Sequence, residues 1–117
     1  MYLKEKLAKL GDELAQEVYP LTYRFPKEER FGLADQLRRA IVSVPVNIIE
    51  GCNRLSDKEK KQFLNIAYAS LKESRYLLYF AYKQDFIGED GYLRLTAKLD
   101  GLGKLLFSFI KKLGAER

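Results

Sequence analysis

Residues 3–25 read LKEKLAKLGDELAQEVYPLTYRF, and apolar side chains recur in this stretch at every third or fourth position. On a helical wheel, at roughly 100° per residue, these side chains fall within an arc of about 80°. The pattern predicts a helix over residues 2–25 with one narrow apolar seam. Pro20 removes a backbone hydrogen bond of this helix, so we expect a kink near residues 16–20 or a loosened last turn. The seam consists of Leu3, Leu7, Leu10, Leu14, Val18, Leu21 and Phe25.

A second helical pattern follows directly. Pro26 ends the first helix, because the residue before a proline disfavours the α-helical backbone. The next helix is predicted over residues 27–50, with acidic side chains in its first turn. We expect this helix to bend at Pro45 and to stop at Gly51.

The remaining two helices have recognisable starts or seams. Ser56 and Glu59 have the spacing of a capping box, which opens a helix over residues 56–84. Leucines at helical spacing predict a fourth helix over residues 89–113. Short connections leave no room for a crossover, so neighbouring helices must run in opposite directions. The sequence therefore predicts an all-α fold, an antiparallel up-and-down four-helix bundle, with residues 1–117 as a single domain.

The composition is that of a soluble globular protein. Hydrophobic residues make up 47% of the chain and charged residues 32%, which is too apolar for disorder and too charged for a membrane protein. No apolar run approaches the ~18 residues that span a bilayer, and charges interrupt the N-terminal stretch that a secretory signal would need. We expect a cytoplasmic protein that has no membrane partner.

The chain offers little for catalysis or metal binding. It has one cysteine, Cys52, and no histidine, which excludes an internal disulfide, Cys/His zinc sets and catalysis by histidine. Residues 101–104, GLGK, are similar to a phosphate-binding loop, but they lie inside a helical pattern and lack the Walker spacing. We therefore expect no catalytic residues, no metal site and no cofactor, and we do not expect an enzyme.

The second predicted helix is apolar over too much of its circumference. Its apolar residues cover about 240°, which is more than a helix of a four-helix monomer buries. One interpretation makes the remaining polar strip a plain solvent face. We favour the other, in which Val42, Val46 and Ile49 pack against another subunit while the strip forms hydrogen bonds at that junction. The polar strip consists of Gln36, Arg39, Ser43, Asn47, Glu50 and Arg54.

The third predicted helix carries a stripe of cations and tyrosines. No carboxylate of this helix falls in the stripe, and the net charge of +5 permits a nucleic acid as partner. Cations bind phosphates and aromatic rings stack on bases, so the stripe suits RNA or DNA. A solvated face with cation–π contacts and a docking site for a protein remain open as alternatives. This basic-aromatic stripe consists of Lys61, Asn65, Tyr68, Lys72, Arg75, Tyr79 and Lys83. The inward face of the same helix is predicted to hold Phe63, Ile66, Ala67, Ser70, Leu71, Ser74, Leu77, Leu78 and Ala81.

Residues 18–54, VYPLTYRFPKEERFGLADQLRRAIVSVPVNIIEGCNR, resemble the four-helix-bundle proteins encoded in intervening sequences of bacterial 23S rRNA genes. The resemblance continues into the third helix and covers nearly the whole chain. The matching pieces include Phe25-Pro26-Lys27-Glu28, Phe31-Gly32-Leu33, Gln36, Arg38-Arg39-Ala40, Val42-Ser43-Val44-Pro45, Asn47-Ile48, Glu50-Gly51, Phe63-Leu64, Ile66-Ala67 and Ser70-Leu71.

The resemblance implies a bundle that assembles as a ring-like homopentamer. A related group, the accessory proteins of diversity-generating retroelements, is similar in fold and binds nucleic acid and a reverse transcriptase through basic surfaces. This chain departs from the family at Pro20, at Ile49 and in residues 72–79, so the basic-aromatic stripe is its own feature. The family's signature residues fall on or beside the polar strip, at Arg38, Arg39, Ser43, Asn47 and Glu50.

These observations together predict a non-enzymatic, oligomeric nucleic-acid-binding protein that is associated with RNA. Lysine and arginine side chains of the stripe would contact phosphates, and Tyr68 and Tyr79 would stack on bases. The alternative is an adaptor that docks onto a partner protein such as a reverse transcriptase, and a chain without any tight ligand is a third reading. The predicted phosphate contacts are Lys61, Lys72, Arg75 and Lys83.

Overall fold

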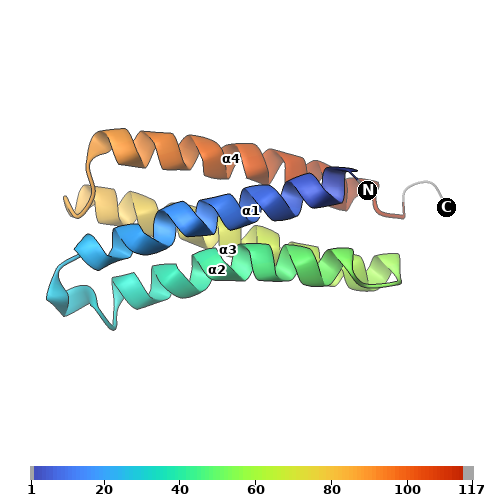
Figure 1. Cartoon of the computed structure of the whole chain (residues 1–117), viewed down its shortest axis with the longest axis horizontal. Helices are drawn as coiled ribbons and strands as arrows, with labels where there is room; N and C mark the ends of the chain where they lie inside the picture. The colour runs from blue at the N-terminus through green and yellow to red at the C-terminus, as the bar shows by residue number, and fades with distance from the viewer. Residues whose placement is uncertain (1, 115–117) are drawn as a thin grey trace.

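The computed structural model describes residues 2–114, which form four long helices and two short 3₁₀ turns (Figure 1). The helices are α1 (Tyr2–Leu21), α2 (Leu33–Cys52), α3 (Asp57–Lys83) and α4 (Glu89–Lys112). Each helix packs against its two neighbours in a ring, α1 on α2, α2 on α3, α3 on α4 and α4 on α1. Successive connections lie at alternate ends of a body that measures 50 × 25 × 18 Å. The predicted all-α, up-and-down four-helix bundle is confirmed.

The corner between α1 and α2 differs from the prediction. Helix α1 ends at Leu21, one residue after Pro20, and the chain continues through 3₁₀ turns at Thr22–Arg24 and Lys27–Glu29. Residues 27–32, which were predicted to be α-helical, therefore lie outside α2. The backbone of Leu33 donates to the Glu29 carboxylate over 3.1 Å, so Glu29 satisfies a free N–H group at the true start of α2.

The other helix limits lie close to the predicted ones, apart from the stop at Gly51. Gly51 is helical, and α2 continues to Cys52. A Cβ atom at Gly51 would lie only 2.9 Å from Leu64 Cγ, so this glycine permits close packing of α2 on α3. The Ser56 side chain accepts a hydrogen bond from the Glu59 backbone at 3.1 Å, which confirms the predicted cap of α3.

The interior of the bundle is one continuous apolar cluster to which all four helices contribute. The predicted inward face of α3 is wrong at one point, because Ile66 is 49% exposed while Leu64 is fully buried beneath Gly51. Within the described part of the chain, none of the helices has both the length and the hydrophobicity that a membrane crossing requires. The largest fully buried side chains are Leu7, Val18, Leu37, Ile41, Ile48, Leu64, Leu71, Leu78, Leu95, Leu99, Leu102 and Leu106.

Candidate nucleic-acid interface

The basic-aromatic stripe of α3 runs along the side of that helix that borders α4. Three of its residues make contacts across the helix boundary. The ring centroids of Tyr68 and Phe107 lie 5.9 Å apart, and those of Tyr79 and Tyr92 lie 6.4 Å apart. Arg75 forms an ion pair with Asp100. Lys72, Tyr79 and Lys83 are exposed, and Lys61, Tyr68 and Arg75 are half-buried.

The middle of the stripe forms one wall of an open groove between α3 and α4, with a volume of about 280 Å³. Lys72 lies over the Tyr68 ring, with its Nζ atom 5.2 Å from the ring centroid. On the α4 side, Lys111 lies over the Phe107 ring at 5.5 Å. Two aromatic rings therefore line one groove, and each has a cation above it. The groove is lined by Tyr68, Lys72, Asp100, Gly103, Lys104 and Phe107.

The α4 half of this groove was not predicted from the sequence. Lys104, Phe107 and Lys111 follow one another at spacings of three and four, which places them on one side of α4. That spacing was a usable signal, but only the packing of α4 on α3 shows that they join the stripe. Gly103 allows this packing, since a Cβ atom there would lie 3.3 Å from Leu71 Cδ2.

The carboxylate of Asp100 lines the groove and forms an ion pair with Arg75. Arg75 donates to its two oxygens over 2.7 and 3.1 Å. These hydrogen bonds lower the pKa of Asp100 against an opposing effect of burial, and the charges of Arg75, Lys72 and Lys104 lower it further. Asp100 therefore stays ionised and offsets the charge of Arg75. The role of Arg75 as a phosphate contact stays a prediction. Lys72 and Lys104 make the groove positive, and Lys111 adds charge beside it, above the Phe107 ring.

Beyond the groove, Tyr79 belongs to a cluster of rings near the start of α4. The rings of Tyr82 and Tyr92 are stacked, with centroids 4.4 Å apart and an angle of 5° between their planes. Tyr79 lies beside Tyr92 and 6.2 Å from Tyr76, which is itself exposed. Tyr79 is thus held by neighbouring rings while 41% of its surface remains accessible.

The polar strip of α2 lies against α3 in its middle section. Ser43 Oγ and Ser70 Oγ are 2.8 Å apart, and the Asn47 amide donates to both the carbonyl and the hydroxyl oxygen of Ser43 at 2.9 Å. Gln36 donates to Glu73 of α3 over 3.3 Å. These side chains therefore have partners within the chain. The two ends of the strip form ion pairs along α2, Arg39 with Asp35 and Arg54 with Glu50.

An apolar row runs along the outer surface of α2, opposite its buried face. Val42, Val46 and Ile49 are 38%, 50% and 48% exposed, so residues 2–114 leave a large part of each side chain uncovered. The signature residue Arg38 lies elsewhere, at the corner between α1 and α2, where its Nε donates to Thr22 Oγ1 over 2.7 Å. Among residues 2–114, no three side chains of the metal-binding types gather at one point.

The fold and these surfaces define a small four-helix-bundle protein. Its polar strip lies between α2 and α3, and a basic, aromatic groove lies between α3 and α4. The chain belongs to the 23S rRNA-intervening sequence protein family, whose model matches residues 4–108. Its fold is similar to the crystal structure of a protein with unknown function from the S23 ribosomal protein family of Bacteroides thetaiotaomicron. The two chains are 23% identical with a TM-score of 0.84, over 94% of this chain and 99% of the other. Among curated proteins, none matches this chain.

Proposed function

We propose that this protein is a non-enzymatic, oligomeric RNA-binding protein of the cytoplasm that holds a single strand in the α3–α4 groove. The observation that supports this most strongly is the meeting of cations from two helices over two aromatic rings. Lys72 and Lys104 line the groove with Tyr68 and Phe107, and the one carboxylate that lines it, Asp100, is paired with Arg75. Ammonium groups above rings suit a strand whose phosphates need counterions and whose bases can stack.

The rest of the stripe extends this surface along α3. Lys61 and Lys83 are separated by about 33 Å at 1.5 Å per helical residue, so the stripe follows most of the length of α3. A strand lying along it would meet cations at both ends and rings in between. Tyr79 contributes the second stacking surface, near the C-terminal end of α3 and beside Tyr92 of α4.

Self-association is the second part of the proposal. The exposed apolar row of Val42, Val46 and Ile49 supports a contact with another copy of this chain, as exposed apolar patches mark interaction sites. A single groove offers few phosphate contacts. Several grooves in one assembly would bind a strand with higher avidity, because linked sites raise the effective concentration. The family resemblance suggests a homopentamer as the assembly.

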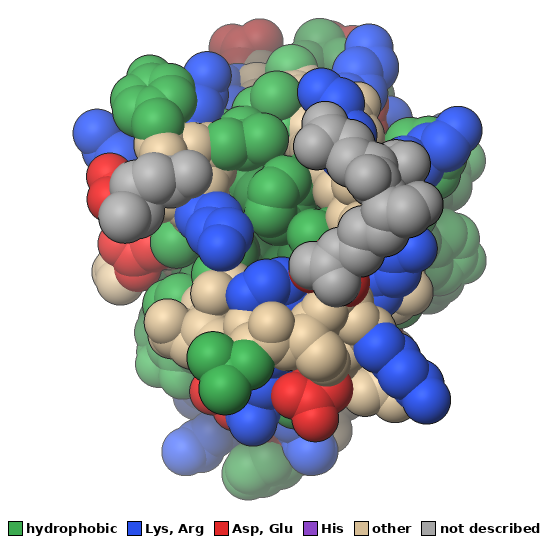
Figure 2. Space-filling model, turned by 90° about the vertical axis from the view of Figure 1, so that its right-hand side faces the viewer, with side chains coloured by type: hydrophobic (Ala, Val, Ile, Leu, Met, Phe, Trp, Pro, Cys, Tyr) green, Lys and Arg blue, Asp and Glu red, His purple; other side chains and the backbone are tan. Residues whose placement is uncertain are grey.

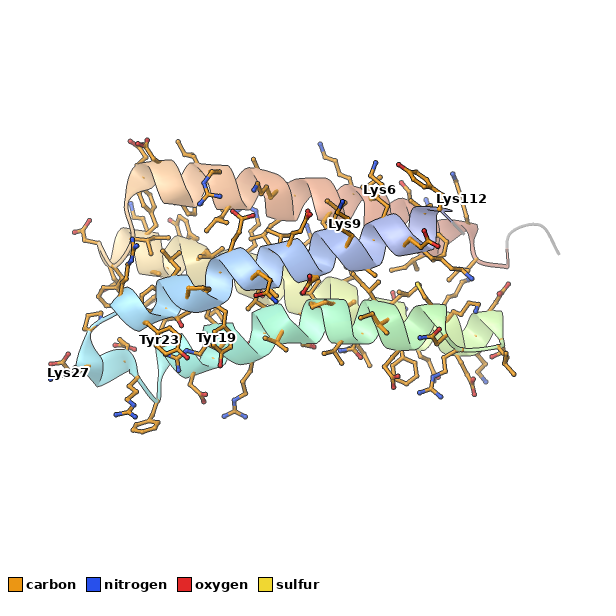
Figure 3. All side chains as sticks on the ribbon, in the orientation of Figure 1. Lys6, Lys9, Tyr19, Tyr23, Lys27 and Lys112 are labelled. Atoms are coloured by element: carbon orange, nitrogen blue, oxygen red, sulfur yellow. The ribbon has the colours of Figure 1, made fainter. Side chains whose placement is uncertain are left out.

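Charge reversal in the groove tests the RNA contact. We expect Lys72→Glu with Lys104→Glu to lower the affinity for a labelled single-stranded RNA by about tenfold or more, and to reduce the slope of log K against log salt by about 1.4. Fluorescence anisotropy measures both. The matched control, Lys6→Glu with Lys9→Glu, makes the same charge change on α1, where both lysines are exposed (Figure 3). Equal losses in the two double variants would contradict the groove as the site.

A second experiment, on binding to a partner protein, separates RNA binding from the alternative function. An adaptor that docks onto a protein such as a reverse transcriptase would use the exposed apolar and aromatic side chains, including Tyr76, which is 58% exposed. Binding to a partner protein that persists at roughly 0.5 M salt would favour the adaptor, because a phosphate-dominated complex weakens steeply with salt.

A further inference from the structure

A second group of cations surrounds a cavity at the corner between α1 and α2, away from the α3–α4 groove. The cavity has a volume of about 390 Å³. Figure 3 shows Tyr19, Tyr23 and Lys27 at this corner, while Lys6, Lys9 and Lys112 lie toward the opposite end of the bundle. Three cations and no carboxylate line the cavity. Its lining consists of Thr22, Tyr23, Phe25, Pro26, Lys27, Arg30, Ala34 and Arg38.

Arg38 is held in place by contacts that leave its charge uncompensated. Its Nε donates to Thr22 Oγ1 over 2.7 Å, and the buried Thr22 hydroxyl donates in turn to the Tyr19 carbonyl oxygen over 2.7 Å. The guanidinium carbon lies 4.5 Å from the Tyr23 ring centroid and 5.9 Å from that of Tyr19. Within residues 2–114, its terminal nitrogens have no hydrogen-bond acceptor.

Four arginines of the described residues form ion pairs, while Arg38, like Arg24 and Arg30, does not. Each of the four has a carboxylate within 4 Å, whereas Arg38 has none among residues 2–114 and is held instead by the Thr22 hydroxyl. The nearby Glu29 carboxylate accepts from the Leu33 backbone and does not line the cavity. A guanidinium fixed through Nε presents its two terminal nitrogens as a fork, which matches the oxygens of a phosphate group. The paired arginines are Arg39, Arg54, Arg75 and Arg94.

We propose that this corner is a binding site for the phosphate group of a nucleotide. Arg38 binds two phosphate oxygens with its terminal nitrogens, and Lys27 and Arg30 add positive charge at the rim. The Tyr23 ring, which is 66% exposed, offers a stacking surface for the attached base. This site is separate from the α3–α4 groove and does not depend on it. The phosphate can belong to a free mononucleotide or to a nucleic-acid strand.

Calorimetric titration with adenosine 5′-monophosphate, and with adenosine as the reference, tests the site. We expect the monophosphate to bind the full chain at low ionic strength and adenosine to bind at least about tenfold more weakly, because hydrogen bonds to charged groups are strong. The variant Lys27→Gln with Arg30→Gln changes exposed side chains and should lower the affinity for the monophosphate by a similar factor. The control Arg24→Gln with Lys9→Gln removes two exposed cations outside the cavity and should leave binding within about twofold.

Two further arms complete the test. Thermal melting of each variant shows whether the fold is kept, and Arg38→Lys, which retains the charge but not the fork, should bind the monophosphate more weakly than the wild type does. A 5′-phosphorylated oligonucleotide that binds more tightly than its unphosphorylated form identifies a terminal phosphate on a strand. Equal binding of adenosine and its monophosphate, or equal losses in the cavity and control variants, would overturn the proposal. Unchanged monophosphate binding by Lys72→Glu with Lys104→Glu would keep this site distinct from the groove.

Discussion

Small residues set how closely the helices of this bundle approach one another. Gly11 faces Pro45 of α2, where a Cβ atom would lie 3.3 Å from the Pro45 Cα atom. Gly51 faces Leu64, and Gly103 faces Leu71. These contacts join α1 to α2, α2 to α3 and α3 to α4. The glycines that weaken a helix locally therefore allow the packing that places the groove residues side by side.

A pair of glycine substitutions tests this packing. Gly51→Ala should destabilise the protein by about 1–3 kcal/mol, because its Cβ atom would clash with Leu64. Gly101→Ala has open space around it and should stabilise α4 by about 0.5–1 kcal/mol. Urea unfolding measures both changes. A neutral Gly51→Ala variant would show that α2 and α3 do not pack as described.

The ion pair between Arg75 and Asp100 predicts a pH dependence. The pKa of Asp100 is lowered in the folded protein, so its contribution is present above the unfolded-state pKa of about 3.9 and is lost as pH falls through the lower folded-state pKa. Both side chains are more than a third exposed, at 38% and 42%, so the pair contributes less than about 1 kcal/mol. Asp100→Asn should be slightly less stable than the wild type at pH 7, and the two should converge toward pH 2. A stability difference that is the same at both pH values would contradict this.

At the scale of helices, hydrophobic periodicity predicted all four elements because each buries one apolar face. The same periodicity could not predict the turn at residues 27–32, where the Glu29 side chain caps α2 and replaces a helical turn. It also favoured Ile66 over Leu64 for the core, because the buried face of α3 depends on how α2 and α4 share it. The stripe was predictable from one helix. Its partners Lys104 and Phe107 were not, because contacts across helices depend on their relative register.

The outer row of α2 makes a prediction at this scale. Val46→Glu changes a half-exposed side chain, so the fold should be retained with a stability change within about 0.5 kcal/mol, while self-association should be lost. The matched control is Leu93→Glu on α4, where Leu93 is 55% exposed. Sedimentation velocity at micromolar concentration measures the assembly. A monomeric wild type, or an unchanged Val46→Glu assembly, would contradict self-association through this row.

Over the whole molecule, the positive charge is distributed unevenly between paired and unpaired cations. Several cations are paired with carboxylates; Arg94 and Lys98, for example, both contact Glu17 and lower its pKa. Others gather where few carboxylates offset them, at the α3–α4 groove and at the corner of α1 and α2. Lysine and arginine side chains also lie around the end of the bundle that Figure 2 shows. An assembly of such chains would present these surfaces in several copies, which steepens the salt dependence of binding.

Photo-crosslinking of a 4-thiouridine-substituted single-stranded RNA tests the central claim most directly, because it maps the contact without changing the protein. Mass spectrometry of the crosslinked peptides should find RNA on the segments of α3 and α4 that carry Tyr68 and Phe107, with the yield falling steeply as salt is raised. Crosslinks that leave both of these segments unlabelled, at low salt and with RNA bound, would contradict the α3–α4 groove as the nucleic-acid interface.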